Sequence, residues 1–339
     1  FLEELTQALP ARDDLRSAQA LPDTIQGVLA ARIDRLSEEV KRTLQTAAVL
    51  GREFSVRLLR AVSDHTSGLV KDLAALKQLE FLYERAEAEG PVYTFKHALT
   101  QEVAYDSLLT SRRQALHEAA GCAIEDFYPD RLEEHYELLA HHFSRSASGD
   151  KALDYLEFAN RKAMKANAVF DAKGFFEQAM RILDALEDSD MHRHRRVALI
   201  AAQVDVFILT NQLDQYESYL ERFAPVAHGL SDQGLRGAFL SSLGHCQFGL
   251  ARPLQAIQTL GPAAALCEQA GHFEAAGRAY VHLQWSHLLT GEFEKAISFE
   301  APTLAALARA PNLRLRVYAF GASAWAYSRL GRWDQAIEK

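Results

Sequence analysis

Three histidines in one short segment could form a metal site. His135, His141 and His142 lie among Glu134 and Glu137. His135 and His142 are seven residues apart, so a helix would place them on the same face. The segment has no His-Glu-x-x-His pattern, and no fourth ligand of the kind a zinc site needs is evident. We therefore interpret it as a packed helix end, and a metal-dependent hydrolase using His135 and His142 stays an alternative.

Other patterns that carry chemistry are missing from the sequence. It contains neither a Gly-x-x-x-x-Gly-Lys-Ser/Thr phosphate loop nor a Gly-x-Gly-x-x-Gly segment after a strand. Its three cysteines are scattered, and their odd number argues against a disulfide framework: Cys122, Cys246 and Cys267. We expect no catalytic residue, no metal and no cofactor in this chain.

Two sets of side chains recur at a fixed spacing that favours binding over catalysis. An arginine column could clamp acidic partner segments, although a solvated face with local ion pairs is the alternative. An aromatic set could line a ligand-facing groove, with core packing as its alternative. The arginines are Arg196, Arg236 and Arg316, and the aromatic residues are Trp285, Trp325 and Tyr327.

A repeat of 40 residues positions these side chains. Four segments align without insertion and begin at Asn211, Ala251, Gly291 and Gly331. Each copy has the apolar spacing of two antiparallel helices. One helix pair cannot bury its apolar face alone, so the copies must stack into an α-solenoid with a concave groove, and such arrays bind partners. We place this tetratricopeptide-like array at residues 150–339, with a truncated last repeat.

The preceding residues, 21–110, predict a winged helix-turn-helix domain. Short helices are followed by alternating residues over 81–87 and 92–96, which is the order of helices and hairpin in that domain. Its recognition helix, expected over 68–80, carries Lys71 and Lys77 but also Asp72 and Glu80. Its outward face is then near neutral, so we do not expect direct nucleic-acid binding. Connecting helices occupy residues 111–149.

Bulk composition agrees with a mainly α-helical cytoplasmic protein. The 339 residues are 48% hydrophobic and carry a net charge of −8, which disfavours general binding to phosphate backbones. No apolar run approaches the roughly 18 residues of a membrane span. The chain starts at Phe1 inside an amphipathic pattern and stops at Lys339 one turn into a helix. We therefore interpret it as a fragment of a longer polypeptide.

One stretch is more specific than the repeats. Residues 93–109, Tyr-Thr-Phe-Lys-His-Ala-Leu-Thr-Gln-Glu-Val-Ala-Tyr-Asp-Ser-Leu-Leu, resemble the segment that follows the nucleotide-binding module in bacterial signal-transduction ATPases of the STAND class. Residues 21–36 resemble the end of the ATPase lid region of that family, and residues 46–54 resemble its winged-helix entry. Residues 138–143, Leu-Leu-Ala-His-His-Phe, are similar to its run into the repeats.

The resemblance implies a regulatory region without activity of its own. Residues 1–20 would end the ATPase lid, and ATP with Mg²⁺ would bind in a domain of the parent that lies outside this chain. His97 matches the family motif and would either link the hairpin to the next helix or approach the nucleotide in the parent. The repeats would sense a protein or small-molecule signal and communicate with the ATPase domain. The output of the parent would be a class III adenylate/guanylate cyclase or a DNA-binding domain.

Overall fold

The computed structural model describes residues 24–87 and 90–339. Residues 1–20, expected to end an ATPase lid, lie outside this range. The chain divides into two compact units, Phe1–Ala159 and Asn160–Lys339. Across the described residues, no helix has the length and apolar character needed to cross a bilayer.

The first unit begins with four helices whose ends follow from local chemistry. They are α2 (Ile25–Asp34), α3 (Glu38–Leu50), α4 (Val56–Val62) and α5 (Leu69–Gln78). The Thr24 hydroxyl caps α2 by accepting from the Gly27 N–H at 3.1 Å. Gly51 ends α3 with a φ of 119°, a backbone conformation that suits glycine.

A small antiparallel sheet follows, in the strand order β1-β3-β2. The predicted hairpin is confirmed as β2 (Leu82–Glu87) and β3 (Gly90–Phe95), with Leu82 opposite Phe95. A third strand, β1 (Glu53–Ser55), was not expected, because three residues are too few to show an alternating pattern. Phe54, Phe81 and Phe95 pack in the core between this sheet and the helices.

Helices complete the first unit. They are α6 (Ala98–Asp106), α7 (Thr110–Phe127), a 3₁₀ helix (Pro129–His135) and α8 (Tyr136–Phe143). Helix α9 (Gly149–Lys165) ends in the second unit. Within the connecting segment 111–149, the 3₁₀ helix runs to His135 and α8 begins directly after it at Tyr136.

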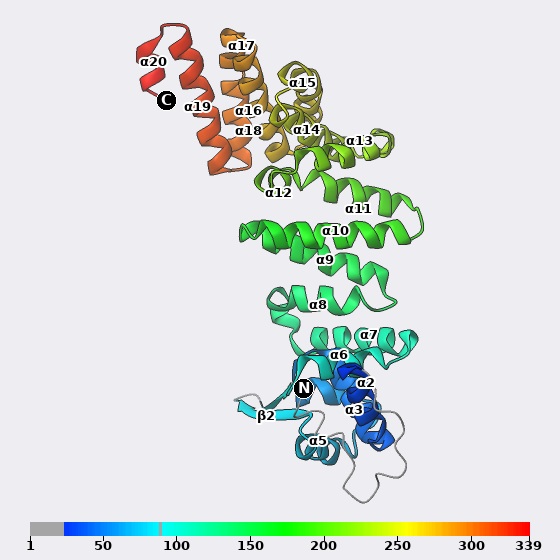
Figure 1. Cartoon of the computed structure of the whole chain (residues 1–339). Coiled ribbons are helices and arrows are strands. Elements are labelled where there is room, and N and C mark those ends of the chain that lie inside the picture. Colours follow the sequence, from blue (N-terminus) through cyan, green and yellow to red (C-terminus); the bar gives the residue numbers. More distant parts are fainter. Residues whose placement is uncertain (1–23, 88–89) are drawn as a thin grey trace, which may run out of the picture. The chain divides into compact units, whose positions relative to one another are not determined.

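The second unit is a series of antiparallel helix pairs (Figure 1). Helices α11 (Asp190–Ala201), α12 (Val204–Leu209), α14 (Gln233–Gly249), α16 (Phe273–Leu289) and α19 (Leu313–Arg329) alternate with a second set. That set is α10 (Val169–Ala185), α13 (Leu213–Gly229), α15 (Pro253–Gln269), α17 (Phe293–Ser298), α18 (Glu300–Arg309) and α20 (Trp333–Ile337). The predicted mainly α fold, ending in a tetratricopeptide-like solenoid, is confirmed.

The 40-residue period has a backbone origin. Asn211, Ala251, Gly291 and Gly331 all have a positive φ, between 56° and 80°. In each copy the next residue donates a hydrogen bond back to a carbonyl five residues earlier, as Glu292 does to His287 at 2.8 Å. This left-handed cap stops the first helix of each pair and turns the chain into the second helix.

One helix of the repeats is interrupted. The first helix of its pair breaks between α11 and α12, where Gln203 is fully buried. The Gln203 and Asn160 amide groups exchange two hydrogen bonds, of 3.0 and 3.2 Å. This buried amide pair fixes the break.

Candidate functional site

The first helices of the successive pairs form one surface of the second unit. Helices α11 and α12, α14, α16 and α19 neighbour one another in that order. The Asp205 carboxylate on α12 reaches the Arg314 guanidinium on α19 at 2.6 Å, across 109 residues of sequence. That contact places these helices on the inner, concave side of the array.

This inner surface contains a cavity of about 590 Å³. Its walls come from α11, α14 and the start of α16, and many of its residues are small. The lining includes Ala198, Ala201, Ala202, Leu235, Ala238, Ser241, Ser242, Phe273, Glu274, Ala275 and Arg278. Small side chains leave room for a bound group, and the charged residues stand at one edge.

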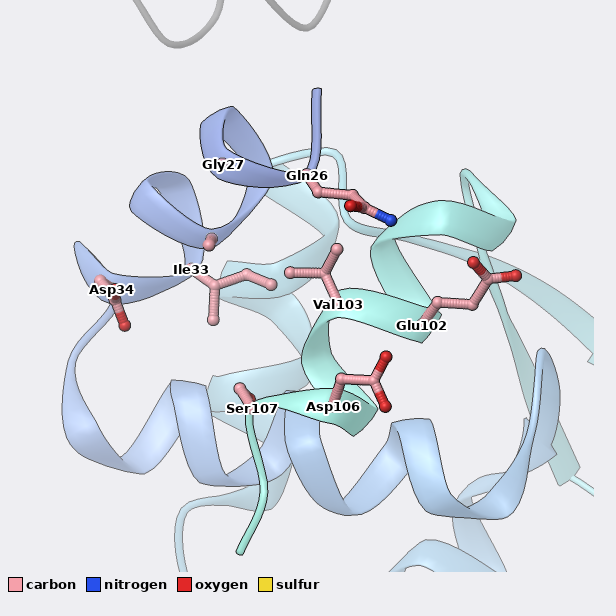
Figure 2. A pocket seen from close by; sticks show the side chains of 9 residues that line it. Gln26, Gly27, Ile33, Asp34, Glu102, Val103, Asp106 and Ser107 are labelled. Carbon is pink, nitrogen blue, oxygen red and sulfur yellow. The ribbon is translucent and has the colours of Figure 1, made fainter. Parts of the chain in front are cut away.

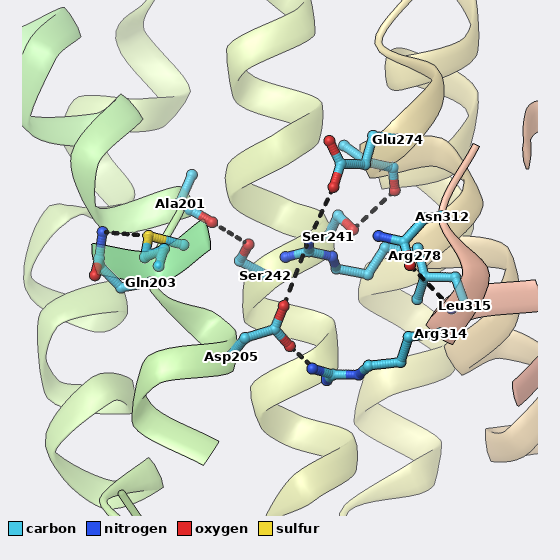
Figure 3. A network of polar contacts seen from close by, with 12 residues as sticks. Ala201, Gln203, Asp205, Ser241, Ser242, Glu274, Arg278, Asn312, Arg314 and Leu315 are labelled. Atoms are coloured by element: carbon cyan, nitrogen blue, oxygen red, sulfur yellow. Dashed lines mark hydrogen bonds and ion pairs between the residues drawn. The ribbon is translucent and has the colours of Figure 1, made fainter. Parts of the chain in front are cut away.

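The two serine hydroxyls on the cavity wall are satisfied within the protein (Figure 3). The Ser241 hydroxyl donates to the Ala275 carbonyl at 3.0 Å, and the Ser242 hydroxyl donates to the Ala201 carbonyl at 2.7 Å. These bonds tie α14 to α16 and to α11. They also leave the wall largely apolar in character, because the hydroxyl protons are used.

Four charged groups form a network, and two of them, Glu274 and Arg278, line the cavity. The second Asp205 oxygen lies 3.8 Å from Nη2 of Arg278, and the Glu274 carboxylate lies 3.7 Å from the same atom. Both distances exceed hydrogen-bond length, whereas the Asp205–Arg314 contact does not. The Arg278 side chain is only 15% exposed, and that of Arg314 is 47% exposed. One nearly buried guanidinium therefore has carboxylates near it but no short bond to either.

Two stacked histidines lie close to this network. The rings of His245 on α14 and His282 on α16 are 3.5 Å apart between centroids. Burial lowers the pKa of His282 to about 4, and burial together with the neighbouring His282 holds the pKa of His245 well below its usual range. Both rings are therefore neutral at pH 7 and leave the charge balance to the arginines and carboxylates.

The three arginines predicted to form a ladder are placed differently from one another. Arg196 on α11 pairs with Asp184 at 3.1 Å and lies over the Phe223 ring, so it packs between helices. Arg236 on α14 is half-buried, and its Nε is buried without a hydrogen-bond partner in the described part of the chain. Arg316 on α19 is exposed.

The predicted aromatic residues lie near the end of the array. Trp285 on α16 is partly buried and donates its indole N–H to the Tyr318 carbonyl at 3.1 Å. Trp325 on α19 is 46% exposed and meets Trp285 edge to face. Tyr327 is on the same helix but faces Lys339, with the ammonium 6.0 Å from its ring centre. Trp285 therefore contributes to packing between repeats, and Trp325 offers an open face.

Sequence reasoning missed the arginines that do reach the groove, Arg278 and Arg314. A usable signal existed in the spacing. Glu274 and Arg314 stand in one repeat column, eleven residues before Trp285 and Trp325 respectively. Eleven residues are about three helical turns, so these side chains share a face with the tryptophans.

The histidine segment does not form the expected shared face. His135 stacks on Tyr128, with ring centres 4.2 Å apart. His142 is fully buried, and its Nδ1 lies 3.0 Å from Nδ1 of His117 on α7. Within the described ranges, no three His, Cys, Asp or Glu side chains are grouped as metal ligands. The two rings therefore belong to different clusters and not to one shared face.

Two further predicted positions lie in the first unit. His97 immediately precedes α6 and is half-buried. Asp72 on α5 was expected on the outward face, but it is buried and accepts a hydrogen bond from Thr43 at 2.9 Å. On the outward side, Lys77 is paired with Glu84.

A second, smaller cavity lies between α2 and α6 (Figure 2). It measures about 420 Å³, and Ile33 and Val103 supply its apolar wall. Its carboxylates Asp34 and Asp106 are each paired outward, with Lys41 at 2.5 Å and Arg113 at 3.3 Å. The larger cavity of the repeat array, with its unevenly paired arginines, is the stronger candidate site.

Comparison with known proteins supports the fold and leaves the activity open. No family model matches this chain. An uncharacterized protein of Rhizobium meliloti (strain 1021) is 25% identical over 219 residues, which is 62% of this chain and 21% of that protein. The chain thus spans about a fifth of the length of this relative.

Solved structures with similar chains are helical-repeat proteins. The apo form of RapI has a TM-score of 0.50 at 9% identity, over 95% of this chain and 75% of its own. A Rap protein complexed with competence and sporulation factor has a TM-score of 0.45 at 12% identity, over 96% and 86%. A STAND protein with a tetratricopeptide repeat sensor from Pyrococcus horikoshii has a TM-score of 0.41 at 14% identity, over 99% and 53%. At these identities the likeness concerns the fold alone.

Proposed function

We propose that this chain is the partner-binding, regulatory region of a larger STAND-type signalling ATPase. The observation that carries the proposal is the cavity of about 590 Å³ on the inner helices, with a small-residue wall and charged groups at one edge. Concave surfaces of helical repeats are extended binding sites. A shape of this kind suits an extended polypeptide segment better than a reaction centre, since its two serine hydroxyls donate to backbone carbonyls and not to a general base.

The wider architecture is part of the same proposal. We take residues 21–110 as a winged helix-turn-helix module that serves packing rather than DNA recognition. The resemblance of residues 93–109 supports a preceding ATPase domain, which would bind ATP and Mg²⁺, with His97 as the residue of this chain nearest to the nucleotide. The array would then act as the sensing arm in the cytoplasm, without catalytic activity of its own.

The output of the parent has two candidates. A class III adenylate or guanylate cyclase is our first choice, because proteins that the 93–109 segment resembles often carry one. A DNA-binding output, making the parent a transcription regulator, is the second. Cyclic-nucleotide production by the full-length parent, measured with and without ATP, separates these candidates.

Binding to the groove is tested with a filled cavity. Ala202 lines the cavity and is exposed, so Ala202→Trp adds bulk to the groove without overpacking the core. The matched control is Ala305→Trp, at an exposed position on the outer helix α18. A phage-displayed library of random 12-residue peptides is panned on the whole chain. We expect enriched peptides to bind the wild type and Ala305→Trp equally and to lose at least about tenfold in affinity for Ala202→Trp. Equal binding to all three proteins would contradict the proposal.

A further inference from the structure

We infer that the groove receives an acidic segment of a polypeptide partner. In the free chain, Asp205 occupies the position that a carboxylate of the partner takes on binding. This inference rests on the proposed function and names the chemistry of the partner. Asp205 presents both of its oxygens to guanidinium groups of two different repeats, at 2.6 Å from Arg314 and 3.8 Å from Arg278 (Figure 3). One carboxylate bridging two arginines marks a site where a second carboxylate can bind in the same way.

The geometry of Arg278 leaves binding capacity unused. Its side chain is mostly buried at the edge of the cavity, and its two carboxylate neighbours are both beyond hydrogen-bond length. Arg278 itself lines the cavity, so a ligand in the cavity lies beside its guanidinium. An entering carboxylate can therefore form the short contact that Asp205 and Glu274 do not form with Arg278.

Charge balance explains why Asp205 competes with the partner. Asp205 and Glu274 together neutralise Arg278 and Arg314. A third carboxylate makes the cluster negative unless one of the two leaves. Asp205 is the carboxylate that pairs with Arg314, and its side chain is about one-third exposed. Water therefore already weakens the Asp205–Arg314 ion pair, which the partner's carboxylate must replace.

The cavity next to these charges selects a polypeptide over other anions. Ala201, Ala238 and Phe273 form an apolar wall within reach of Arg278. A partner segment with an apolar side chain next to an acidic one fills both parts of the site. Its apolar group packs on the cavity wall, and its carboxylate binds the arginines. A polyanion such as nucleic acid lacks the apolar side chain that would fill the cavity beside this wall.

The test uses the whole chain and the random 12-residue phage library, with binders to Ala202→Trp removed. Enriched peptides are synthesised and titrated calorimetrically against the wild type, Asp205→Asn and Arg314→Gln. Arg222→Gln is the matched control, because Arg222 is 63% exposed on the outer helix α13. Thermal unfolding of each variant verifies that it folds.

We expect enriched peptides with an Asp or Glu close to an apolar residue. Arg314→Gln should weaken their binding by about tenfold, Asp205→Asn should tighten it about threefold or more, and Arg222→Gln should leave it unchanged. Replacing the acidic residue of the peptide by its amide should abolish the effect of Arg314→Gln. If enriched peptides carry no acidic residue, or bind Asp205→Asn no more tightly than the wild type, the inference is overturned while the groove remains a binding site. If no peptide is enriched over Ala202→Trp, the proposed function fails as well.

Discussion

Acidification should destabilise the first unit through a buried pair of neutral histidines. His117 and His142 are almost fully buried, with their Nδ1 atoms 3.0 Å apart, and Nε2 of His117 lies 2.9 Å from the Tyr105 hydroxyl. Burial is the main cause that lowers the pKa of each ring to about 3. Two protonated rings would also point N–H groups at each other across the Nδ1 contact. The fold therefore requires both histidines to be neutral.

The magnitude follows from linkage. An unfolded histidine has a pKa of about 6.5, so the unfolded chain binds more protons than the folded chain between about pH 3 and pH 6.5. Stability is complete above that window and falls as the pH drops through it. From pH 7 to pH 5, each histidine lowers the free energy of unfolding by about 2 kcal/mol, and the pair by about 4 kcal/mol. This is a large share of the 5–15 kcal/mol that is typical of a domain.

Hydrogen exchange measured by mass spectrometry resolves the effect in peptides from α7 and α8. His142→Gln replaces one titrating ring by a neutral, polar amide. We expect it to reduce the pH dependence of the opening free energy by about half. His65→Gln, at an exposed position in the same unit, is the control and should keep the wild-type pH dependence. Equal pH dependence in the wild type and His142→Gln would refute the reasoning.

Three stability predictions concern single contacts. A Cβ at Gly244 would lie 2.4 Å from Cγ of Leu260, so Gly244→Ala should lower the free energy of unfolding by about 1–3 kcal/mol, as measured by urea unfolding followed by tryptophan fluorescence. Ala251 has a φ of 58°, which L-residues adopt at a cost, so Ala251→Gly should raise the free energy of unfolding by about 0.5–1 kcal/mol. An unchanged urea midpoint would contradict this expectation. Asp72→Ala leaves the Thr43 hydroxyl buried without its acceptor and should cost about 1–3 kcal/mol, detected as a lower unfolding midpoint by circular dichroism.

Much of the fold could be predicted because it repeats. The 40-residue register indicated the helix pairs, and the capping positions at Asn211, Ala251, Gly291 and Gly331 explain it in backbone terms. The hairpin also followed from its alternating pattern. Local patterns such as these are decided by neighbouring residues, which a single sequence displays.

Features that depend on distant partners could not be predicted. Asp72 is buried because Thr43, 29 residues away, donates to it. The break before α12 depends on Asn160, 43 residues from Gln203. The arginine column was an attractive pattern, yet Arg196 is used between helices, whereas Arg278 and Arg314 reach the groove. Which polar side chain faces the groove depends on helix rotation within each repeat, and column alignment alone does not give that rotation.

The most direct test of the account is a hydrogen-exchange footprint of the whole chain with and without a saturating enriched peptide. Binding in the groove predicts added protection in the inner helices α11, α14, α16 and α19, and none in helix α5 of the first unit. Ala202→Trp should abolish that footprint, and Ala305→Trp should preserve it. Protection confined to the outer helices α13, α15 and α18, or to the first unit, would contradict the central claim that the inner surface of the repeats is the partner-binding site.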